Sequence, residues 1–140
     1  MSAGTGIVHA EYNEEPEETQ IFQIWIIPDA AGHEPRWDAK AFPKEDRAGE
    51  LVVLASGRSQ DAGALRINQD AAVLGATITK GQKVVHTLGQ GRKAYLVPAV
   101  GSISVNGQQV NARDGVAIAE EDTIEIVANE TSEIVLVDVP

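Results

Sequence analysis

The periodicity of its apolar residues constrains the fold of this 140-residue chain more than any other feature. Short apolar or alternating runs recur along the chain, the helix period is almost absent, and Gly, Asn and Asp break the runs at close intervals. The runs that predict strands are Ile21–Ile27, Leu51–Leu54, Ala71–Thr79, Lys83–Leu88, Thr123–Val127 and Glu133–Val139. Roughly ten short strands with tight turns indicate an all-β fold, either a barrel or a double-sheet jelly roll.

One hairpin can be placed more closely than the other turns. Ile103 and Val105 share one face of an alternating run, and Asn106-Gly107 follows them. This dipeptide suits a two-residue turn in which both residues need positive φ. We therefore predict that residues 108–112 form the return strand.

Charge and composition exclude several functions. The chain has 11 Lys and Arg against 21 Asp and Glu, a formal net charge of −10, which repels the phosphates of nucleic acids and anionic membranes. It has no cysteine, which excludes disulfides and thiolate metal sites. The first residues do not resemble a signal peptide, and no apolar run approaches the ~20 residues of a membrane helix. We expect a cytoplasmic protein that binds neither nucleic acid nor membranes.

The polar stretch Gly32–Asp46 differs from the rest and predicts either a long connection or an irregular edge segment. Trp25 and Trp37 are interpreted as buried anchors, because large aromatic side chains dominate the packing of cores. His86 lies within an apolar run, where we expect a packed or hydrogen-bonded strand residue rather than a metal ligand.

Three stretches of the sequence carry a family resemblance. They are Gly4–Asn13 with Gln23–Pro28, Gly91–Gly107, and Asp114–Ile118 with Ile134–Pro140. Together they resemble the pirin family, whose members hold two cupin domains in one chain. The resemblance covers nearly the whole chain and implies a cupin-type β-barrel or jelly roll, also called a double-stranded β-helix. Residues 1–28 then resemble the end of the first cupin and the crossing strand, and residues 29–140 the C-terminal cupin, in a single compact domain overall.

The resemblance also implies a metal site. Pirins similar to this chain bind a divalent metal, usually iron, in the first cupin through three His and one Glu, and His9 and Glu11 match the last His and the Glu of that motif. The earlier His pair has no counterpart in these 140 residues. In the C-terminal cupin, His86 stands where a cupin would usually begin a His-x-His motif, but the residue two positions later is Leu88. This cupin is therefore predicted to be metal-free.

His9 and Glu11 lie two residues apart, so on a strand both side chains point to one face. That arrangement suits two ligands of one metal. Mononuclear non-haem iron needs at least two His and one carboxylate, so two protein ligands do not complete a site. We therefore expect no cofactor in the isolated chain, and a divalent metal, most readily iron, if other residues complete the site.

Three functions stay open at this point. The first is a metal-dependent quercetin 2,3-dioxygenase type of enzyme, in which another chain supplies the missing ligands. The second, which we favour for this chain alone, is a non-catalytic pirin-like cupin module that packs against a partner. The third is a β-barrel that binds an apolar small molecule in its interior.

A prediction about partners follows from the resemblance. In a two-cupin protein the strand Ile21–Ile27 packs between the domains, so without the first cupin it leaves an apolar patch or an unpaired edge. We expect a homo-oligomer formed through this strand, most simply a two-fold dimer, or packing against an N-terminal cupin.

Overall fold

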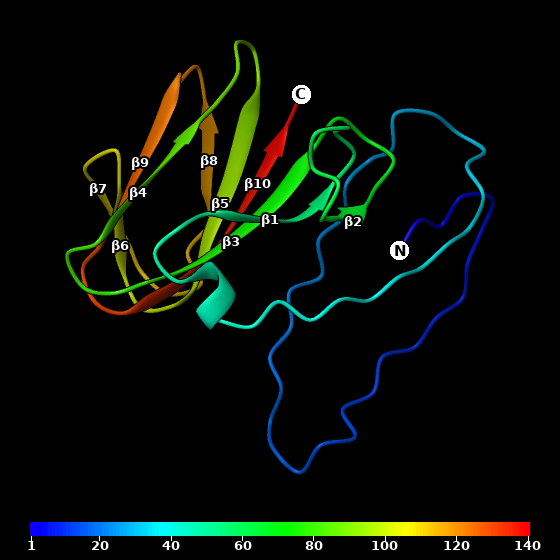
Figure 1. Ribbon diagram of the computed structural model, residues 1–140, viewed down its shortest axis with the longest axis horizontal. Helices are drawn as coiled ribbons and strands as arrows, with labels where there is room; N and C mark the ends of the chain where they lie inside the picture. The colour runs from blue at the N-terminus through cyan, green and yellow to red at the C-terminus, as the bar shows by residue number, and fades with distance from the viewer.

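The computed structural model describes residues 1–140, and its regular structure begins at a short 3-10 helix, η1 (Glu45–Arg47). Ten strands follow: β1 (Val52–Ser56), β2 (Leu65–Arg66), β3 (Ala72–Ile78), β4 (Lys83–Thr87), β5 (Lys93–Val100), β6 (Ile103–Val105), β7 (Gln108–Val110), β8 (Val116–Ala119), β9 (Thr123–Ala128) and β10 (Ser132–Val139). Before η1 the chain runs as an extended loop beside the strands (Figure 1). The predicted all-β class is confirmed.

The strands form two sheets that face each other (Figure 1). One has six strands in the order β2-β1-β3-β10-β5-β8, and the other has four in the order β4-β9-β6-β7. All neighbours are antiparallel except β1 and β2. The first sheet has β10 near its centre, paired with β3 on one side and β5 on the other, so the C-terminal strand ties this sheet together.

The core lies between the sheets and is almost wholly aliphatic. In β10, alternate residues are buried, as the period of a strand with one face on a core requires. Strands β3, β5 and β9 direct further apolar side chains inward, and 17 buried residues from both sheets make one cluster. Leu88, which follows β4, belongs to this cluster.

The predicted hairpin is confirmed. Strands β6 and β7 pair with Val105 opposite Gln108, which leaves a two-residue turn at Asn106 and Gly107. Both turn residues have positive φ, 45° and 83° respectively, as the sequence requires. The Asn106 side chain also accepts a hydrogen bond from the backbone N–H of Glu125, which fixes the turn against β9.

The apolar pattern does not predict strand β5. This strand contains Pro98, a residue that lacks a backbone donor and argues against an interior strand. Here the pairing of β5 with β10 shifts register between Glu133 and Ile134, and Pro98 is opposite Ile134 at that irregularity. Proline is tolerated at a bulge, which explains how an eight-residue strand includes it.

Two expectations for the N-terminal part are wrong. Residues Ile21–Ile27 form no strand, and the backbone between Ile7 and Pro28 makes no hydrogen bond to other backbone groups. A strand needs a neighbouring strand to satisfy its N–H and C=O groups, and none lies beside this segment. Trp25 and Trp37, expected to be buried, are 86% and 74% exposed, because no core surrounds this segment.

The stretch Gly32–Asp46 is a long connection, the first of the two predicted alternatives, and η1 occupies its end. The structure contains no helix of the length and apolarity required to traverse a bilayer.

Candidate functional site

Polar side chains converge at one end of the sandwich because of the strand register. Asp138, near the end of β10, is directly opposite Ala72 of β3 on one side and Ala94 of β5 on the other. Ala72 is in turn opposite Ser56, the last residue of β1. All four residues are buried, so this row of the six-stranded sheet faces the core.

Three charged residues continue the row beyond the strand ends. Arg58 follows Ser56 by two positions, and Asp70 and Arg92 precede the buried alanines of β3 and β5 by two positions. Because side chains two positions apart in an extended chain share a face, all three can turn toward Asp138. The register therefore brings together residues from distant parts of the sequence, as the salt bridge between Arg58 and Asp138 shows.

Asp138 is the centre of this group, and its side chain is 2% exposed. Its Oδ2 is 2.8 Å from Nε2 of His86, which lies on β4 of the opposite sheet. Its Oδ1 accepts a hydrogen bond from Nε of Arg92 at 2.6 Å and lies 2.9 Å from Nη2 of Arg58. The contact with Arg58 has ion-pair distance without hydrogen-bond geometry, so Nη2 is buried with no hydrogen-bond acceptor.

Asp70 joins the same two arginines on the solvent side. Its Oδ1 accepts from Nε of Arg58 at 3.3 Å and its Oδ2 from Nη1 of Arg92 at 3.0 Å, while its backbone oxygen accepts from Nη2 of Arg92 at 2.7 Å. Two carboxylates and two guanidinium groups thus alternate in a closed ring. We call these residues, with His86, the Asp138 network.

The network sets the protonation of its central carboxylate. Burial by itself raises the pKa of Asp138, but the contacts with His86, Arg92 and Arg58 outweigh it and lower the pKa from 3.8 to about 2. Burial lowers the pKa of Arg92, and the two aspartates outweigh that effect and raise this pKa above its ordinary value. Both groups are therefore charged at neutral pH, and the network is a fixed structural feature under those conditions.

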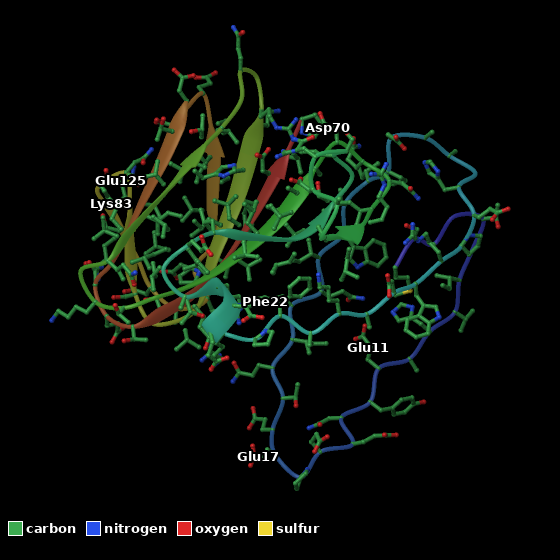
Figure 2. The ribbon with its side chains drawn as sticks, viewed as in Figure 1. Glu11, Glu17, Phe22, Asp70, Lys83 and Glu125 are labelled. Carbon is green, nitrogen blue, oxygen red and sulfur yellow. The ribbon has the colours of Figure 1, made fainter.

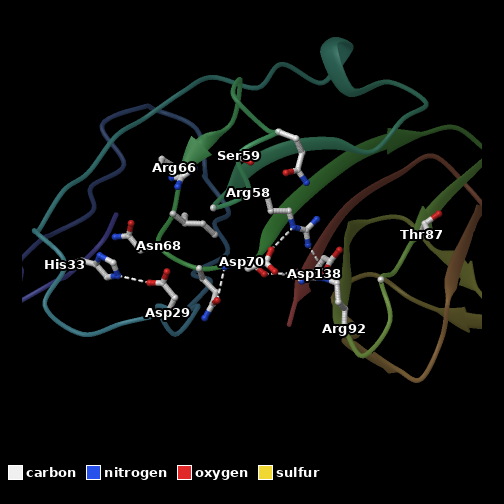
Figure 3. A pocket seen from close by; sticks show the side chains of 15 residues that line it. Asp29, His33, Arg58, Ser59, Arg66, Asn68, Asp70, Thr87, Arg92 and Asp138 are labelled. Carbon is white, nitrogen blue, oxygen red and sulfur yellow. Dashed lines mark hydrogen bonds and ion pairs between the residues drawn. The ribbon is translucent and has the colours of Figure 1, made fainter.

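A polar cleft of about 770 Å³ opens beside the network. Fifteen residues line it and only Ile67 is hydrophobic. Figure 3 shows Asp29, His33, Arg66 and Asn68 on one side of the cleft, and Arg58, Asp70, Arg92 and Asp138 on the other. The N-terminal connection supplies part of the first side, where His33 and Asp29 are 2.7 Å apart.

The predicted metal ligands, His9 and Glu11, lie elsewhere. Both are on the extended N-terminal segment, and Figure 2 shows Glu11 away from the two sheets. Nε2 of His9 is 3.8 Å from Oε1 of Glu11, with side chains 38% and 56% exposed. The structure brings these two side chains together, but neither approaches His33 or His86 closely enough for all of them to bind one ion, since no group of three or more potential ligands is present.

The donor chemistry of this pair fits part of a metal site. Metal–donor bonds of about 2.1 Å place neighbouring donors about 3 Å apart, so the observed 3.8 Å between the two atoms would have to shorten by somewhat less than about 1 Å. An imidazole nitrogen and a carboxylate oxygen are also ligands that iron accepts. The pair alone offers two donors, so further ligands would have to come from outside this chain.

The expectation that His86 is a hydrogen-bonded strand residue is confirmed by its contact with Asp138. The sequence reasoning missed Asp138 itself. One signal could have found it: in the run Ile134–Val139, alternation directs position 138 inward with Ile134 and Leu136. An inward carboxylate needs charged or hydrogen-bonding partners, and the pattern does not say which residues supply them.

Comparisons with known proteins agree on one family. A family model described as the quercetinase C-terminal cupin domain matches residues 53–139. A pirin-like protein of Caulobacter vibrioides is 57% identical over 138 residues, which cover 99% of this chain and 60% of that protein. A quercetin 2,3-dioxygenase of Escherichia coli is 34% identical over 141 residues, covering 100% of this chain and 59% of that protein.

A solved structure extends the comparison to the fold. The bacterial pirin YhhW from Escherichia coli, in complex with nickel(II), superposes with a TM-score of 0.75 at 28% identity, covering 83% of this chain and 48% of that one. The chain thus spans about 60% of the length of the curated relatives it matches.

Proposed function

Because this chain belongs to the pirin family, we propose that it serves as a non-catalytic cupin module which presents His9 and Glu11 to a metal site completed by residues outside these 140. The observation that carries this proposal is the occupation of the sandwich interior. Where a cupin would usually place a His-x-His pair, His86 is bound to Asp138 and Leu88 packs in the core. Apolar side chains from both sheets fill the remaining interior.

The paired positions of His9 and Glu11 support the second half of the proposal. They lie on a segment whose backbone makes no hydrogen bond to the backbone of the cupin, and their side chains are close together and exposed. A pair held in this way can complete a coordination sphere that another domain begins. A divalent metal bound there would act as a Lewis acid toward a substrate oxygen.

The packing of the sandwich also weighs against an apolar ligand in the barrel. The core residues are in mutual contact, and the cleft at the end of the sandwich is lined by polar groups. A pocket for an apolar molecule would instead be lined mainly by hydrophobic side chains.

The enzymatic alternative is favoured by the relatives. One is named quercetin 2,3-dioxygenase, and YhhW, which has a similar fold, is described in complex with nickel(II). If a partner completes the site, Glu11 would be both a ligand and the base that takes a proton from a substrate hydroxyl group. That role requires its carboxylate to lie within hydrogen-bond reach of the hydroxyl oxygen.

Metal analysis of the purified chain tests the proposal. We expect less than stoichiometric iron or nickel and no flavonol turnover. The His9→Ala variant should bind as little metal as the unmodified chain, and His33→Ala is the matched control because His33 is also paired with a carboxylate on the N-terminal part. Stoichiometric metal that is lost in His9→Ala but retained in His33→Ala, together with turnover, would establish the enzyme instead.

We further propose that the isolated chain self-associates through Ile21–Ile27. Five large apolar side chains of this segment are exposed, with Trp25 and Ile27 at 86% and 85%. The backbone groups of the segment lack backbone partners, so it can form a strand only with another chain or domain. A second copy offers the same segment and allows a two-fold pairing.

A further inference from the structure

We propose that the polar cleft binds a small hydroxylated carboxylate, of the sugar-acid type, with Arg66 as the partner of the carboxylate group. This inference is independent of the metal proposal, because neither His9 nor Glu11 lines the cleft. The cleft volume of about 770 Å³ lies within the range of small-molecule sites, which is about 300–1,000 Å³.

Some polar groups of the cleft already make hydrogen bonds or ion pairs within the chain, and others do not. Arg92 is held by Asp138 and Asp70 through three hydrogen bonds, and Arg58 is tied to the same two carboxylates. This side is rigid because its central carboxylate is buried and contacted from three directions. It forms a wall whose donors are largely occupied.

Other parts of the lining carry unused groups. Arg66 lines the cleft from β2 and is exposed, and its side chain makes no hydrogen bond or ion pair within the chain. The side chains of Ser59, Gln60 and Thr87 also line the cleft without an intramolecular hydrogen bond. A free guanidinium group in a cleft that also offers hydroxyl and amide groups is suited to a carboxylate, which its planar fork can bind through two parallel hydrogen bonds.

The carboxylates of the cleft can accept hydrogen bonds from the hydroxyl groups of the proposed ligand. The side chains of Asp29 and Asp70 are both exposed, so each carboxylate can accept a hydrogen bond from a hydroxyl group. The same carboxylates repel a doubly charged phosphate more strongly than a singly charged carboxylate. With one apolar residue in its lining, the cleft offers little contact area to an unsubstituted ring.

Local charge is consistent with an anion at this position. Three arginines and three aspartates line the cleft, so their formal charges cancel, whereas the whole chain carries −10. Nη2 of Arg58 is buried and lies 2.9 Å from Oδ1 of Asp138, so this group is held by the Asp138 network.

Titration of the intact chain with gluconate, followed by backbone amide NMR shifts, tests the proposal. We expect saturable shifts at the cleft residues, with glucose and inorganic phosphate binding at least about tenfold more weakly. Arg66→Gln should weaken gluconate binding by about tenfold or more. Arg113→Gln is the matched control, since Arg113 is exposed and bonds through its backbone to Pro98, toward the other end of β5.

Three results would overturn the inference: no saturable shift with gluconate, equal weakening by the two variants, or equal binding of glucose. Because Arg66 is exposed, its replacement should leave the circular dichroism spectrum unchanged. Ser59→Ala provides a second variant in the lining of the cleft, with a smaller expected loss of about two- to fivefold.

Discussion

Replacing Asp138 with Asn is expected to destabilise the fold more than any other single change at the charged end of the sandwich. The side chain keeps its shape but loses its charge. Arg58, Arg92 and His86 then face an amide whose nitrogen is itself a donor, while Asp70 is the only remaining carboxylate. The two arginine side chains are 19% and 17% exposed, so water compensates them only in part.

The magnitude can be worked out from this geometry. Removing one partner of a buried ion pair lowers the free energy of unfolding by about 3–5 kcal/mol. Asp70 still pairs with both arginines, and the arginines retain some contact with water, which reduces the loss. We therefore expect the free energy of unfolding of Asp138→Asn to be about 2–4 kcal/mol lower than that of the unmodified chain at neutral pH.

The effect depends on pH in a defined direction. The pKa of Asp138 is about 2 in the folded chain and 3.8 in the unfolded reference, so the unfolded chain binds more protons between these values. The charged carboxylate thus contributes its stability fully above pH 3.8 and loses it as pH falls toward 2. The difference in pKa is equivalent to about 2 kcal/mol. Over this pH range, the difference in free energy of unfolding between the unmodified chain and Asp138→Asn should therefore shrink by about that amount.

Urea denaturation followed by circular dichroism is the suitable assay. Trp25 and Trp37 are exposed in the extended segment, so tryptophan fluorescence would not report on the core. Asp122→Asn is the control, since Asp122 is exposed and its side chain makes no hydrogen bond or ion pair. Equal stability of Asp138→Asn and the control, or a gap that stays constant from about pH 4 to pH 2, would refute the account of the network.

Three further predictions concern the fold and its surface. Leu88→Ala should lower the free energy of unfolding by about 2–5 kcal/mol in the same assay, because Leu88 is a core residue, and a loss under about 1 kcal/mol would contradict its packing. Gly107→Ala, at φ 83°, should cost about 1 kcal/mol by strain in the turn, whereas Gly63→Ala, where nothing approaches the added carbon and φ is not positive, should be nearly neutral. Trp25→Ser should weaken self-association in sedimentation experiments without changing stability, and a monomeric parent chain would refute that interface.

The sequence predicts the elements whose partners lie inside this chain. The runs over β1, β3, β4, β9 and β10 are apolar or alternate because at least one face of each meets the core, and Asn106-Gly107 specifies its turn locally. The same reasoning fails for Ile21–Ile27. An apolar composition indicates that other atoms cover a segment, but it does not show whether those atoms belong to the same chain. The prediction that Trp25 and Trp37 belong to the core is wrong, because both side chains are exposed.

The Asp138 network could not be predicted because it depends on register. The charged partners of Asp138 become its neighbours only when β1, β3, β5 and β10 are aligned so that Ser56, Ala72, Ala94 and Asp138 form one row. A slip of one residue in any of these pairings would turn a partner to the opposite face of the sheet. The apolar pattern of each strand shows which face is buried, but it does not show which residues stand opposite each other.

This alignment also connects the Asp138 network with the N-terminal segment. The end of the sandwich is rigid because the buried Asp138 carboxylate on β10 bonds to Arg92, which precedes β5, and contacts His86 on β4 of the opposite sheet. Arg92 bonds in turn to Asp70, which precedes β3. The N-terminal connection contacts that same end, where the backbone N–H of Asp29 bonds to Asn68 and the Gln69 side chain bonds to Ile27. The extended segment with His9 and Glu11 is therefore attached to the cupin at the polar cleft. A ligand in the cleft would therefore contact the residues at which that segment joins the sandwich, because Asp29, Asn68 and Gln69 all line the cleft.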